Sequence, residues 1–422
     1  MHGDNETHGW ERRGRDYNPE NDKRSIFLKP FISARPFIEG AWMTKHDGRY
    51  YLQYSAPGTE LHTYGDGYYT ADSPLGPFTY AQSSPFSSKP GGFMPGAGHG
   101  STFQDEHGNW WHIATMRISK AFMFERRIGF FPAGFDKDGV LFCNQEFADY
   151  PLTIPDGPAD PWSLSAKAML LTAGSRPLAS SSAPAHGPEL AIDEDATTWW
   201  VAGDKNPGQW VQVELPEGST VSSIQVNLAE HELKPTVKRS RRETTLTALW
   251  QRHINQTEPA TEFTVQVSKD RSEWTTLHDS RMTGASRSHV FVELEEPAEY
   301  RYVRVTGYSQ PYDGLFAVSG LRVFGHGSGS APAAAVPTAR RTGPMNATVT
   351  WARVPGARGY NLRYGTAADK LYSSWQLDAR TSHDLGALNT GQDYWVAVDS
   401  FNENGITRGA AVRVALTPSE GR

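Results

Sequence analysis

Short runs in which apolar and polar residues alternate, separated by turn-forming residues, constrain the fold of this chain most strongly. Residues 210–215 (WVQVEL), 263–268 (FTVQVS) and 302–307 (YVRVTG) place apolar residues at every second position. Such alternation is typical of strands with one buried face. Glycine and proline supply 40 and 28 of the 422 residues, and runs with a helical period are scarce. The sequence therefore predicts an all-β protein.

Charge and composition exclude several function classes. The formal net charge is −6 and the sequence pI is about 6.2, which gives no reason to expect a nucleic-acid partner. The basic run 234–245 (KPTVKRSRRETT) is local and reads as a solvated loop. No apolar run approaches the roughly 18 residues of a membrane span. A single cysteine, Cys143, rules out a disulfide within the chain.

Residues 1–155 contain a weak internal repeat. The segments 43–56 (MTKHDGRYYLQYSA) and 102–115 (TFQDEHGNWWHIAT) both read as a strand, a turn and an aromatic strand, and their turn glycines, Gly48 and Gly108, are 60 residues apart. Two β-meanders with this period indicate propeller blades. A closed ring needs about four blades or more, so these two blades predict only part of a propeller.

Two further β-domains are expected downstream. Residues 156–167 read as a linker, and 168–326 as a β-sandwich or jelly roll. A second, low-complexity linker is predicted at 327–340. Residues 341–418 have the aromatic spacing of a small immunoglobulin-like sandwich, with Trp351, Tyr360, Tyr364 and Tyr394 as its expected core.

Glu39 is the most informative carboxyl group in the sequence. It stands beside Phe37 and Ile38 and three residues before Trp42. Apolar neighbours would partly desolvate the carboxyl group and raise its pKa. A carboxylic acid that stays protonated near neutral pH suits a general acid. The alternative is a turn glutamate that caps a strand.

The first segment resembles the C-terminal blades of glycoside hydrolase family 43, a family of five-bladed propellers. The resemblance covers about 150 residues and rests on FIEGAWMTKHDGRYYLQYSAPGT, GDGYYTADSPLGPFTY, GAGHGSTFQDEHGNWWHIATMRIS and ERRIGFFPAGFDKDGVLF. Members of this family are inverting enzymes with three carboxyl groups. Two are aspartates, one a general base and one that tunes the pKa of the acid, and the third is a glutamate that acts as general acid.

The resemblance assigns roles to several residues. Glu39 matches the general acid, and His99 matches the histidine that holds an ion, often calcium, or a water at the propeller axis. Arg126 or Arg127 occupies the place of a substrate-contacting arginine, although either would also be able to pair with Glu125. Stacking surfaces for sugar rings are expected from aromatic residues that would otherwise be core, namely Trp42, Tyr54, Tyr64 and Trp111.

The chain departs from the family pattern before Glu39. Only 38 residues precede it, and Asp4, Asp16 and Asp22 lack the sequence context of the two family aspartates. The polar N-terminus also has no signal-peptide pattern. The simplest interpretation is a C-terminal part of a longer glycosidase, whose general base and export signal would lie upstream of Met1.

The second domain resembles the discoidin domain (coagulation factor 5/8 C-terminal type), which is also a bacterial carbohydrate-binding module. The resemblance rests on ELAIDEDATTWWVAG, GQWVQVELPEGSTVSSIQV and VSGLRVFG. It implies a structural Ca²⁺ loop with ligands from Asp193, Asp195 and Thr198. A glutamate usual near the last strand is replaced by Ser319-Gly320. The alternative is a turn in which the two aspartates cap backbone amides.

The last domain resembles a fibronectin type III domain through GARGYNLRYGTAADKLY and VDSFNENGIT. Together the resemblances predict a glycosidase that removes terminal arabinofuranosyl, xylosyl or galactosyl residues from plant polysaccharide. They imply a secreted, periplasmic or cell-surface location and no organic cofactor. The alternatives are a non-catalytic carbohydrate-binding and spacer protein, or an adhesion protein with a degenerate propeller.

Overall fold

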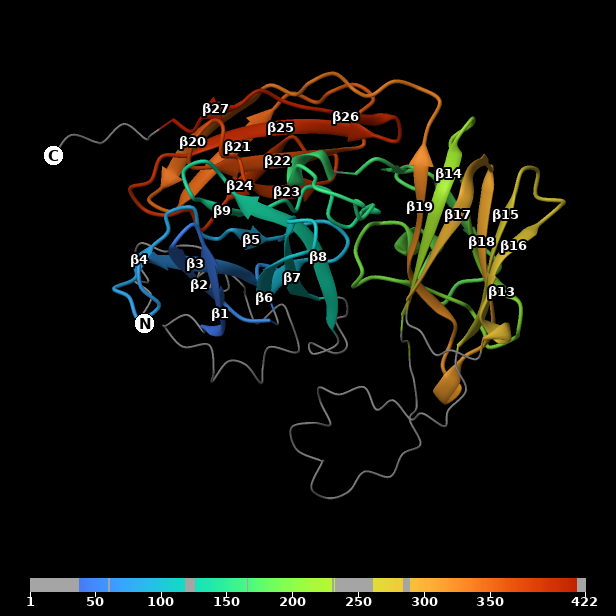
Figure 1. Ribbon diagram of the computed structural model, residues 1–422. Coiled ribbons are helices and arrows are strands. Elements are labelled where there is room, and N and C mark those ends of the chain that lie inside the picture. Colours follow the sequence, from blue (N-terminus) through green and yellow to red (C-terminus); the bar gives the residue numbers. More distant parts are fainter. Residues whose placement is uncertain are drawn as a thin grey trace.

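The prediction of an all-β protein is confirmed. Figure 1 shows the computed structural model, in which every regular element of the described residues is a strand or a short 3₁₀ turn. The described residues are 38–59, 61–117, 126–164, 166–229, 231, 261–283 and 289–415. Within them, no helix has the length and apolar character needed to cross a membrane.

Two antiparallel meanders form the N-terminal part, as the repeat predicts. We call them blade 1 and blade 2. Both hairpin turns contain a glycine in the left-handed region, Gly48 (φ +81°) and Gly108 (φ +85°), a conformation that favours glycine. Blade 1 consists of β1 (Glu39–His46), β2 (Arg49–Ala56), β3 (Gly65–Ala71), β4 (Thr79–Tyr80) and β5 (Ser87–Ser88), and blade 2 of β6 (Gly96–Gln104), β7 (Trp110–Arg117), β8 (Arg126–Phe135) and β9 (Leu141–Cys143).

The blades pack face to face, with β6 against β1, β2 and β3. Aromatic and aliphatic residues from both sheets fill the space between them, among them Tyr51, Tyr68, Met116 and Phe131. A hydrogen bond also links the neighbouring strands β1 and β6: the indole of Trp42 in β1 donates to the Thr102 carbonyl in β6 at 3.0 Å. This contact brings the start of β1 next to the glycine-rich strand β6.

A sandwich of two five-stranded antiparallel sheets follows, the middle sandwich. The alternating runs of the sequence supply its strands, and their apolar faces form a common core that includes Val211, Val265 and Val305. One sheet contains β10 (Met169–Leu170), β12 (Trp200–Val201), β14 (Thr220–Leu228), β17 (His289–Glu299) and β19 (Ala317–His326). The other contains β11 (Arg176–Ala179), β13 (Gln209–Glu214), β15 (Glu262–Ser268), β16 (Thr275–Asp279) and β18 (Tyr302–Ser309).

The C-terminal sandwich has a three-stranded and a five-stranded sheet, and the expected aromatic residues Trp351, Tyr360, Tyr364 and Tyr394 lie in its core. Its strands are β20 (Pro337–Gly343), β21 (Asn346–Trp351) and β24 (Ser382–Leu385) in one sheet, and β22 (Gly359–Gly365), β23 (Ser373–Leu377), β25 (Trp395–Asn402), β26 (Gly405–Thr407) and β27 (Val412–Arg413) in the other. The stretch 327–340, predicted as a linker, is partly ordered against the C-terminal sandwich. Strand β20 begins inside it, and Asn402 Nδ2 donates to the Ser330 carbonyl. The Gly/Ser/Ala composition did not indicate these backbone contacts.

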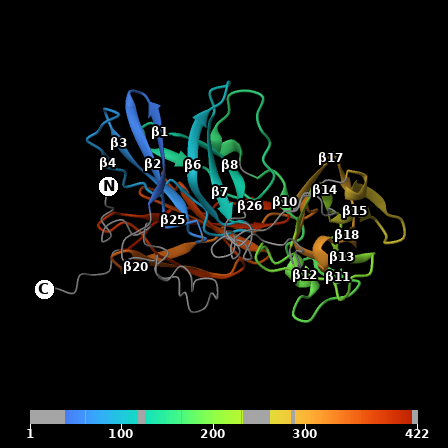
Figure 2. The ribbon, with the colours of Figure 1, turned by 90° about the horizontal axis from the view of Figure 1, so that it is seen from below.

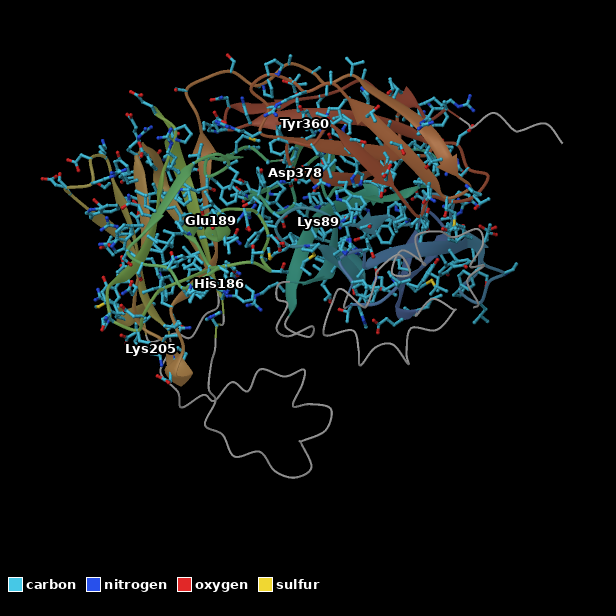
Figure 3. All side chains as sticks on the ribbon, turned by 180° about the vertical axis from the view of Figure 1, so that it is seen from behind. Lys89, His186, Glu189, Lys205, Tyr360 and Asp378 are labelled. Carbon is cyan, nitrogen blue, oxygen red and sulfur yellow. The ribbon has the colours of Figure 1, made fainter. Side chains whose placement is uncertain are left out.

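A buried ionic cluster joins the blades to the middle sandwich. Arg322 of β19 is fully buried; its guanidinium donates to both carboxylate oxygens of Glu194 at 2.8 Å and to the Asp149 carbonyl at 2.7 Å. The Asp149 carboxylate in turn accepts from Lys89 at 2.5 Å and from the Phe93 amide at 2.8 Å. Lys89 lies near the centre of the molecule (Figure 3). Because each buried charge has a partner, this junction holds two parts of the chain in a defined arrangement.

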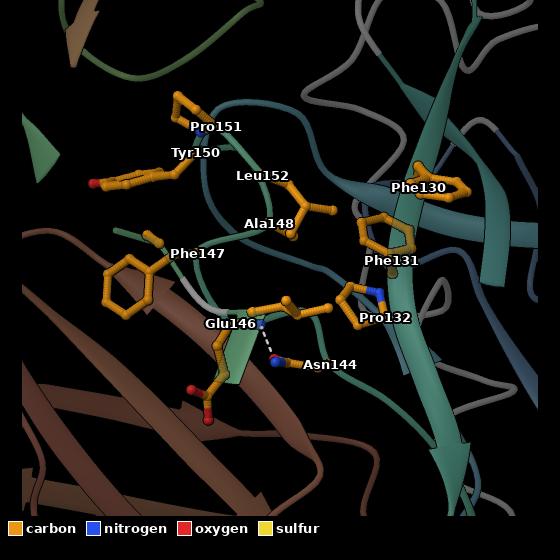
Figure 4. A pocket seen from close by; sticks show the side chains of 12 residues that line it. Phe130, Phe131, Pro132, Asn144, Glu146, Phe147, Ala148, Tyr150, Pro151 and Leu152 are labelled. Carbon is orange, nitrogen blue, oxygen red and sulfur yellow. Dashed lines mark hydrogen bonds between the residues drawn. The ribbon is translucent and has the colours of Figure 1, made fainter. Parts of the chain in front are cut away.

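The C-terminal sandwich packs on blade 2. Asp136, in the turn after β8, accepts from Lys370 Nζ at 2.8 Å and from the Tyr372 hydroxyl at 2.9 Å. Glu146 pairs with Arg363 at 3.6 Å and also with Arg408. Next to this junction, β8 and the chain after β9 line a mainly apolar pocket (Figure 4), in which Asn144 Oδ1 accepts from the Glu146 amide at 3.2 Å.

Candidate functional site

Glu39 is the first residue of β1, beside an irregularity in the pairing of β1 with β2 between Glu39 and Trp42. The next residue, Gly40, has φ +67°, and an added Cβ there would lie 2.8 Å from Ser55 Oγ and 3.1 Å from the His99 ring. Only glycine allows this close approach of the backbone. The irregular start of the strand thereby sets Glu39 beside β6.

Two side chains from distant parts of the sequence meet the Glu39 carboxyl group. The Tyr64 hydroxyl donates to Oε1 at 2.6 Å, and His99 Nδ1 lies 3.7 Å from Oε2. About 30% of the Glu39 side chain and 49% of the His99 side chain remain exposed, so a ligand in solution can reach both. Burial, followed by the hydrogen bond to Glu39 and its charge, raises the pKa of Tyr64 well above its usual range. The phenol therefore stays a hydrogen-bond donor.

A buried carboxylate, Asp66 of β3, fixes the backbone around His99. It accepts from the Ser55 hydroxyl, from the Gly100 amide at 3.0 Å and from His112 Nε2 at 3.1 Å. Ser55 Oγ itself accepts from the His99 amide at 2.6 Å. His99 has φ +54°, a conformation that costs energy for a residue with a Cβ. The bonds to Asp66 and Ser55 hold it in place.

A second chain of buried hydrogen bonds runs behind this carboxylate. His112 Nδ1 lies 2.9 Å from Thr102 Oγ1, which is 2.9 Å from Gln53 Oε1, and Gln53 Nε2 donates to Thr44 Oγ1 at 2.9 Å. These residues come from β1, β2, β6 and β7. The chain links both blades beneath Glu39 and His99.

The surroundings of Glu39 differ from the apolar setting that the sequence suggests. Ile38 packs with the Tyr54 and Ala56 cluster, whereas the Glu39 carboxyl group bonds to a phenol and approaches an imidazole. Ile38, which precedes β1, is thus in a different environment from the carboxyl group. Phe37 lies outside the described residues.

The predicted sugar-contacting residues are placed differently from one another. Trp42 is 41% exposed and stays available to a ligand. Tyr64 is 1% exposed, with its ring against Gly98, so it offers no stacking face and instead positions Glu39. Tyr54 and Trp111 are likewise buried core residues. Arg127 Nε donates to His289 of β17 at 3.3 Å, and the side chain of Arg126 and all of Glu125 lie outside the described residues.

The loop expected to bind calcium is closed by its own hydrogen bonds. Asp193 Oδ1 accepts from the Asp195 amide at 3.1 Å, Asp193 Oδ2 accepts from Thr198 Oγ1 at 2.6 Å, and Asp195 Oδ1 accepts from the Thr197 amide at 2.8 Å. This is the alternative arrangement, in which the aspartates cap backbone amides. Glu194, between them, pairs with Arg322. Burial raises the pKa of Asp193, and the Thr198 bond offsets part of that rise.

Neither predicted calcium position, at His99 or at the loop 193–198, has a full set of metal ligands among the described residues. Calcium takes six to eight oxygen ligands, and among the described residues the carboxylate that pairs with His99 is that of Glu39. In the parts of the chain that the structure describes, no group of three or more His, Cys, Asp or Glu side chains is arranged to hold an ion. The described residues alone do not fit a calcium ion, and no chemistry is assigned to one.

The arrangement of Glu39, Tyr64 and His99 suits proton donation to a bound ligand. A half-exposed carboxyl group has a fixed donor on one oxygen and an imidazole beside the other. Sequence reasoning identified Glu39 and His99 but missed Ser55, Asp66 and His112. A signal for Asp66 was available, because an acidic residue at the start of an aromatic strand needs partners if it faces the core.

Two family models match parts of the chain. The family model described as "Glycosyl hydrolases family 43" matches residues 17–141, and that described as "NedA-like, galactose-binding domain" matches residues 190–305. The N-terminal part therefore contains a family 43 domain, and the middle part a discoidin-type galactose-binding domain.

The similar curated proteins are named as glycosidases. A stretch of 74 residues is 40% identical to the beta-D-galactofuranosidase xynD of Aspergillus niger and covers 17% of this chain and 21% of that protein. Another of 48 residues is 48% identical to a xylosidase/arabinosidase of Bacteroides ovatus and covers 11% and 14%. The matched stretches thus span about a fifth or less of these relatives. A solved structure titled "Glycoside hydrolase" is 17% identical and covers 69% of this chain and 61% of that chain, with a TM-score of 0.37.

Proposed function

We propose that this chain, which carries a family 43 domain and a discoidin-type galactose-binding domain, acts as part of an inverting glycoside hydrolase with Glu39 as its general acid. The substrates would be terminal arabinofuranosyl, xylosyl or galactosyl residues of plant polysaccharide or its oligosaccharides, which places the activity outside the cytoplasm. The family match and the names of the relatives support the reaction class.

The proposal rests on the two contacts of the Glu39 carboxyl group, one with Tyr64 and one with His99. A general acid must reach the leaving oxygen and deliver its proton there. Glu39 is partly exposed, and one of its oxygens is held by Tyr64 at 2.6 Å. The other oxygen, beside His99, is the one that would face the substrate. Asp66 and Ser55 act through His99, as positioning residues.

Inversion also requires a second carboxyl group about 6.5–9.5 Å from the acid, with a water between them. Asp66 does not meet this requirement, because it is buried and three donors occupy its oxygens. Asp4, Asp16 and Asp22 lie outside the described residues. The general base stays unassigned, and we expect this polypeptide by itself to show slow turnover or none.

The test is hydrolysis of chromogenic arabinofuranoside, xyloside and galactoside by the purified chain. Glu39→Gln should abolish any release, whereas Glu106→Gln, which changes an exposed glutamate on blade 2, should not. Release that persists in Glu39→Gln would contradict the role of Glu39. If the folded chain releases nothing, a purely binding role of this polypeptide is favoured.

A second function is favoured by the match to a galactose-binding domain. In this alternative the chain binds carbohydrate through the middle sandwich without cleaving it. Retardation in gels containing galactan or arabinoxylan would then be the same for the wild type and for Glu39→Gln, and no sugar would be released. Hydrolysis that depends on Glu39 would decide against a purely binding role.

A further inference from the structure

The outer face of the sheet formed by β11, β13, β18, β15 and β16 carries a cation between two indole rings. The guanidinium carbon of Arg304 lies 4.6 Å from the centre of the Trp210 ring and 4.0 Å from that of the Trp274 ring. All three side chains are half-buried, so each keeps contact with solvent. Figures 1 and 2 both place this sheet on the side of the molecule away from the blades.

The charge of Arg304 is uncompensated, unlike that of its neighbours. Arg271 and Arg301 both pair with Glu214, at 3.1 Å and 2.8 Å. Arg304 instead donates to the neutral Gln212 Oε1, at 3.1 Å from Nε and 2.7 Å from Nη2. No carboxylate pairs with it among residues 38–415 as far as the structure describes them.

The surrounding charges agree with a cation that lacks a partner. Burial, followed by the charge of Arg271, lowers the pKa of Arg304. Arg281, at the end of the same face over the Tyr308 ring, is paired with Asp279 at 2.6 Å. Among the arginines that lie over aromatic rings on this face, Arg304 is the one without a carboxylate partner in the described residues.

A guanidinium held between two rings is well placed to bind a carboxylate. Its planar N–H groups match the two carboxylate oxygens, and the side chain has little conformational entropy left to lose on binding. The indole rings suit the apolar faces of sugars, and the partly exposed amide of Gln266 on the same face suits their hydroxyl groups. Because Glu214 and Asp279 already pair with Arg271, Arg301 and Arg281, Arg304 offers a place for a single carboxylate.

We infer that this face binds a neutral polysaccharide that bears occasional uronic acid groups, with Arg304 receiving the uronate carboxylate and Trp210 and Trp274 contacting adjacent sugar rings. The site is separate from Glu39 and is tested by binding alone, so its failure would leave the proposed hydrolysis untouched.

The experiment is affinity gel electrophoresis of the whole chain with glucuronoxylan and with the same xylan after reduction of its carboxyl groups. We expect the chain to be retarded about tenfold more strongly by the unreduced polymer, since a charge-assisted pair contributes about 1.5 kcal/mol or more. Arg304→Gln should lose that preference. Arg304→Lys, which keeps the charge without the fork, should keep a smaller part of it.

Arg413→Gln is the matched control. Arg413 also lies over an indole, that of Trp395 at 5.7 Å, but it is paired with Asp393 at 2.8 Å. This variant loses the same charge and should bind as the wild type does, with folding of all variants checked by thermal melts. Equal retardation by both xylans, an unchanged preference in Arg304→Gln, or stronger retardation by single-stranded DNA than by glucuronoxylan would overturn the inference.

Discussion

The hydroxyl group of Tyr64 donates a 2.6 Å hydrogen bond to Oε1 of Glu39, across 25 residues of sequence. A general acid must be held where it can reach the leaving oxygen. The bond fixes the position of the Glu39 carboxyl group in this way. His99, beside the other oxygen, completes the set of contacts that the structure gives to this group.

Replacing Tyr64 by phenylalanine should lower kcat/KM roughly tenfold, because the Glu39 carboxyl group loses the donor that fixes its position. The measurement is hydrolysis of the chromogenic glycoside that the chain cleaves. Tyr68→Phe is the control, because this buried phenol bonds to Ser83 and not to Glu39. Equal losses of kcat/KM in both variants would contradict the role of Tyr64.

Asp66→Asn should destabilise the blades by about 3 kcal/mol, because an amide cannot accept from the Ser55, Gly100 and His112 donors together. Urea unfolding at pH 7 measures the change. The control is Asp138→Asn, whose carboxylate is 56% exposed in its pair with Lys370 and should contribute less than about 1 kcal/mol. Equal effects of the two changes would show that the buried network does not support the site.

The junction between blade 2 and the C-terminal sandwich should weaken in acid. Burial alone would raise the pKa of Asp136, but hydrogen bonds from Lys370, the Val140 amide and Tyr372 outweigh it and hold this pKa below its usual range. A carboxylate with a depressed pKa stabilises the fold above its unfolded pKa, near 4, and loses this contribution as the pH falls through the folded value.

Asp136→Asn should therefore reduce stability by about 1–2 kcal/mol at pH 7, and the difference from the wild type should shrink between pH 4 and pH 2. Urea unfolding of both chains at pH 7, 4 and 2 checks this. A difference that stays constant across these pH values would show that the Asp136 charge does not hold the junction.

Calcium binding by the loop 193–198 stays a prediction, and the loop geometry sets its expected strength. To bind the Asp193 carboxylate, an ion would have to displace the hydrogen bond that Thr198 donates to it at 2.6 Å. The Glu194 carboxylate already pairs with Arg322. We expect a Kd in the millimolar range or weaker, lost in Asp193→Asn. Calorimetric titration of the chelator-treated chain measures it, and a submicromolar Kd would show that the loop rearranges around the ion.

The sequence by itself determined the all-β class and most of the strands, because alternation and turn residues are local signals. Residues 302–307 fall within β18 (Tyr302–Ser309), and Gly48 and Gly108 lie at the two hairpin turns with positive φ. It also singled out Glu39 and His99, through their glycine-rich surroundings and the resemblance that these carry.

Only the tertiary structure decided what surrounds these residues. Ile38 was expected beside the Glu39 carboxyl group, but it packs with the Tyr54 cluster. Tyr64 reaches Glu39 within blade 1, and His112 reaches Asp66 because blade 2 packs on blade 1, at separations of 25 and 46 residues that no local pattern records. A strand's sequence fixes which of its residues share a face, but the neighbours of that face depend on sheets that pair and stack over long stretches of chain.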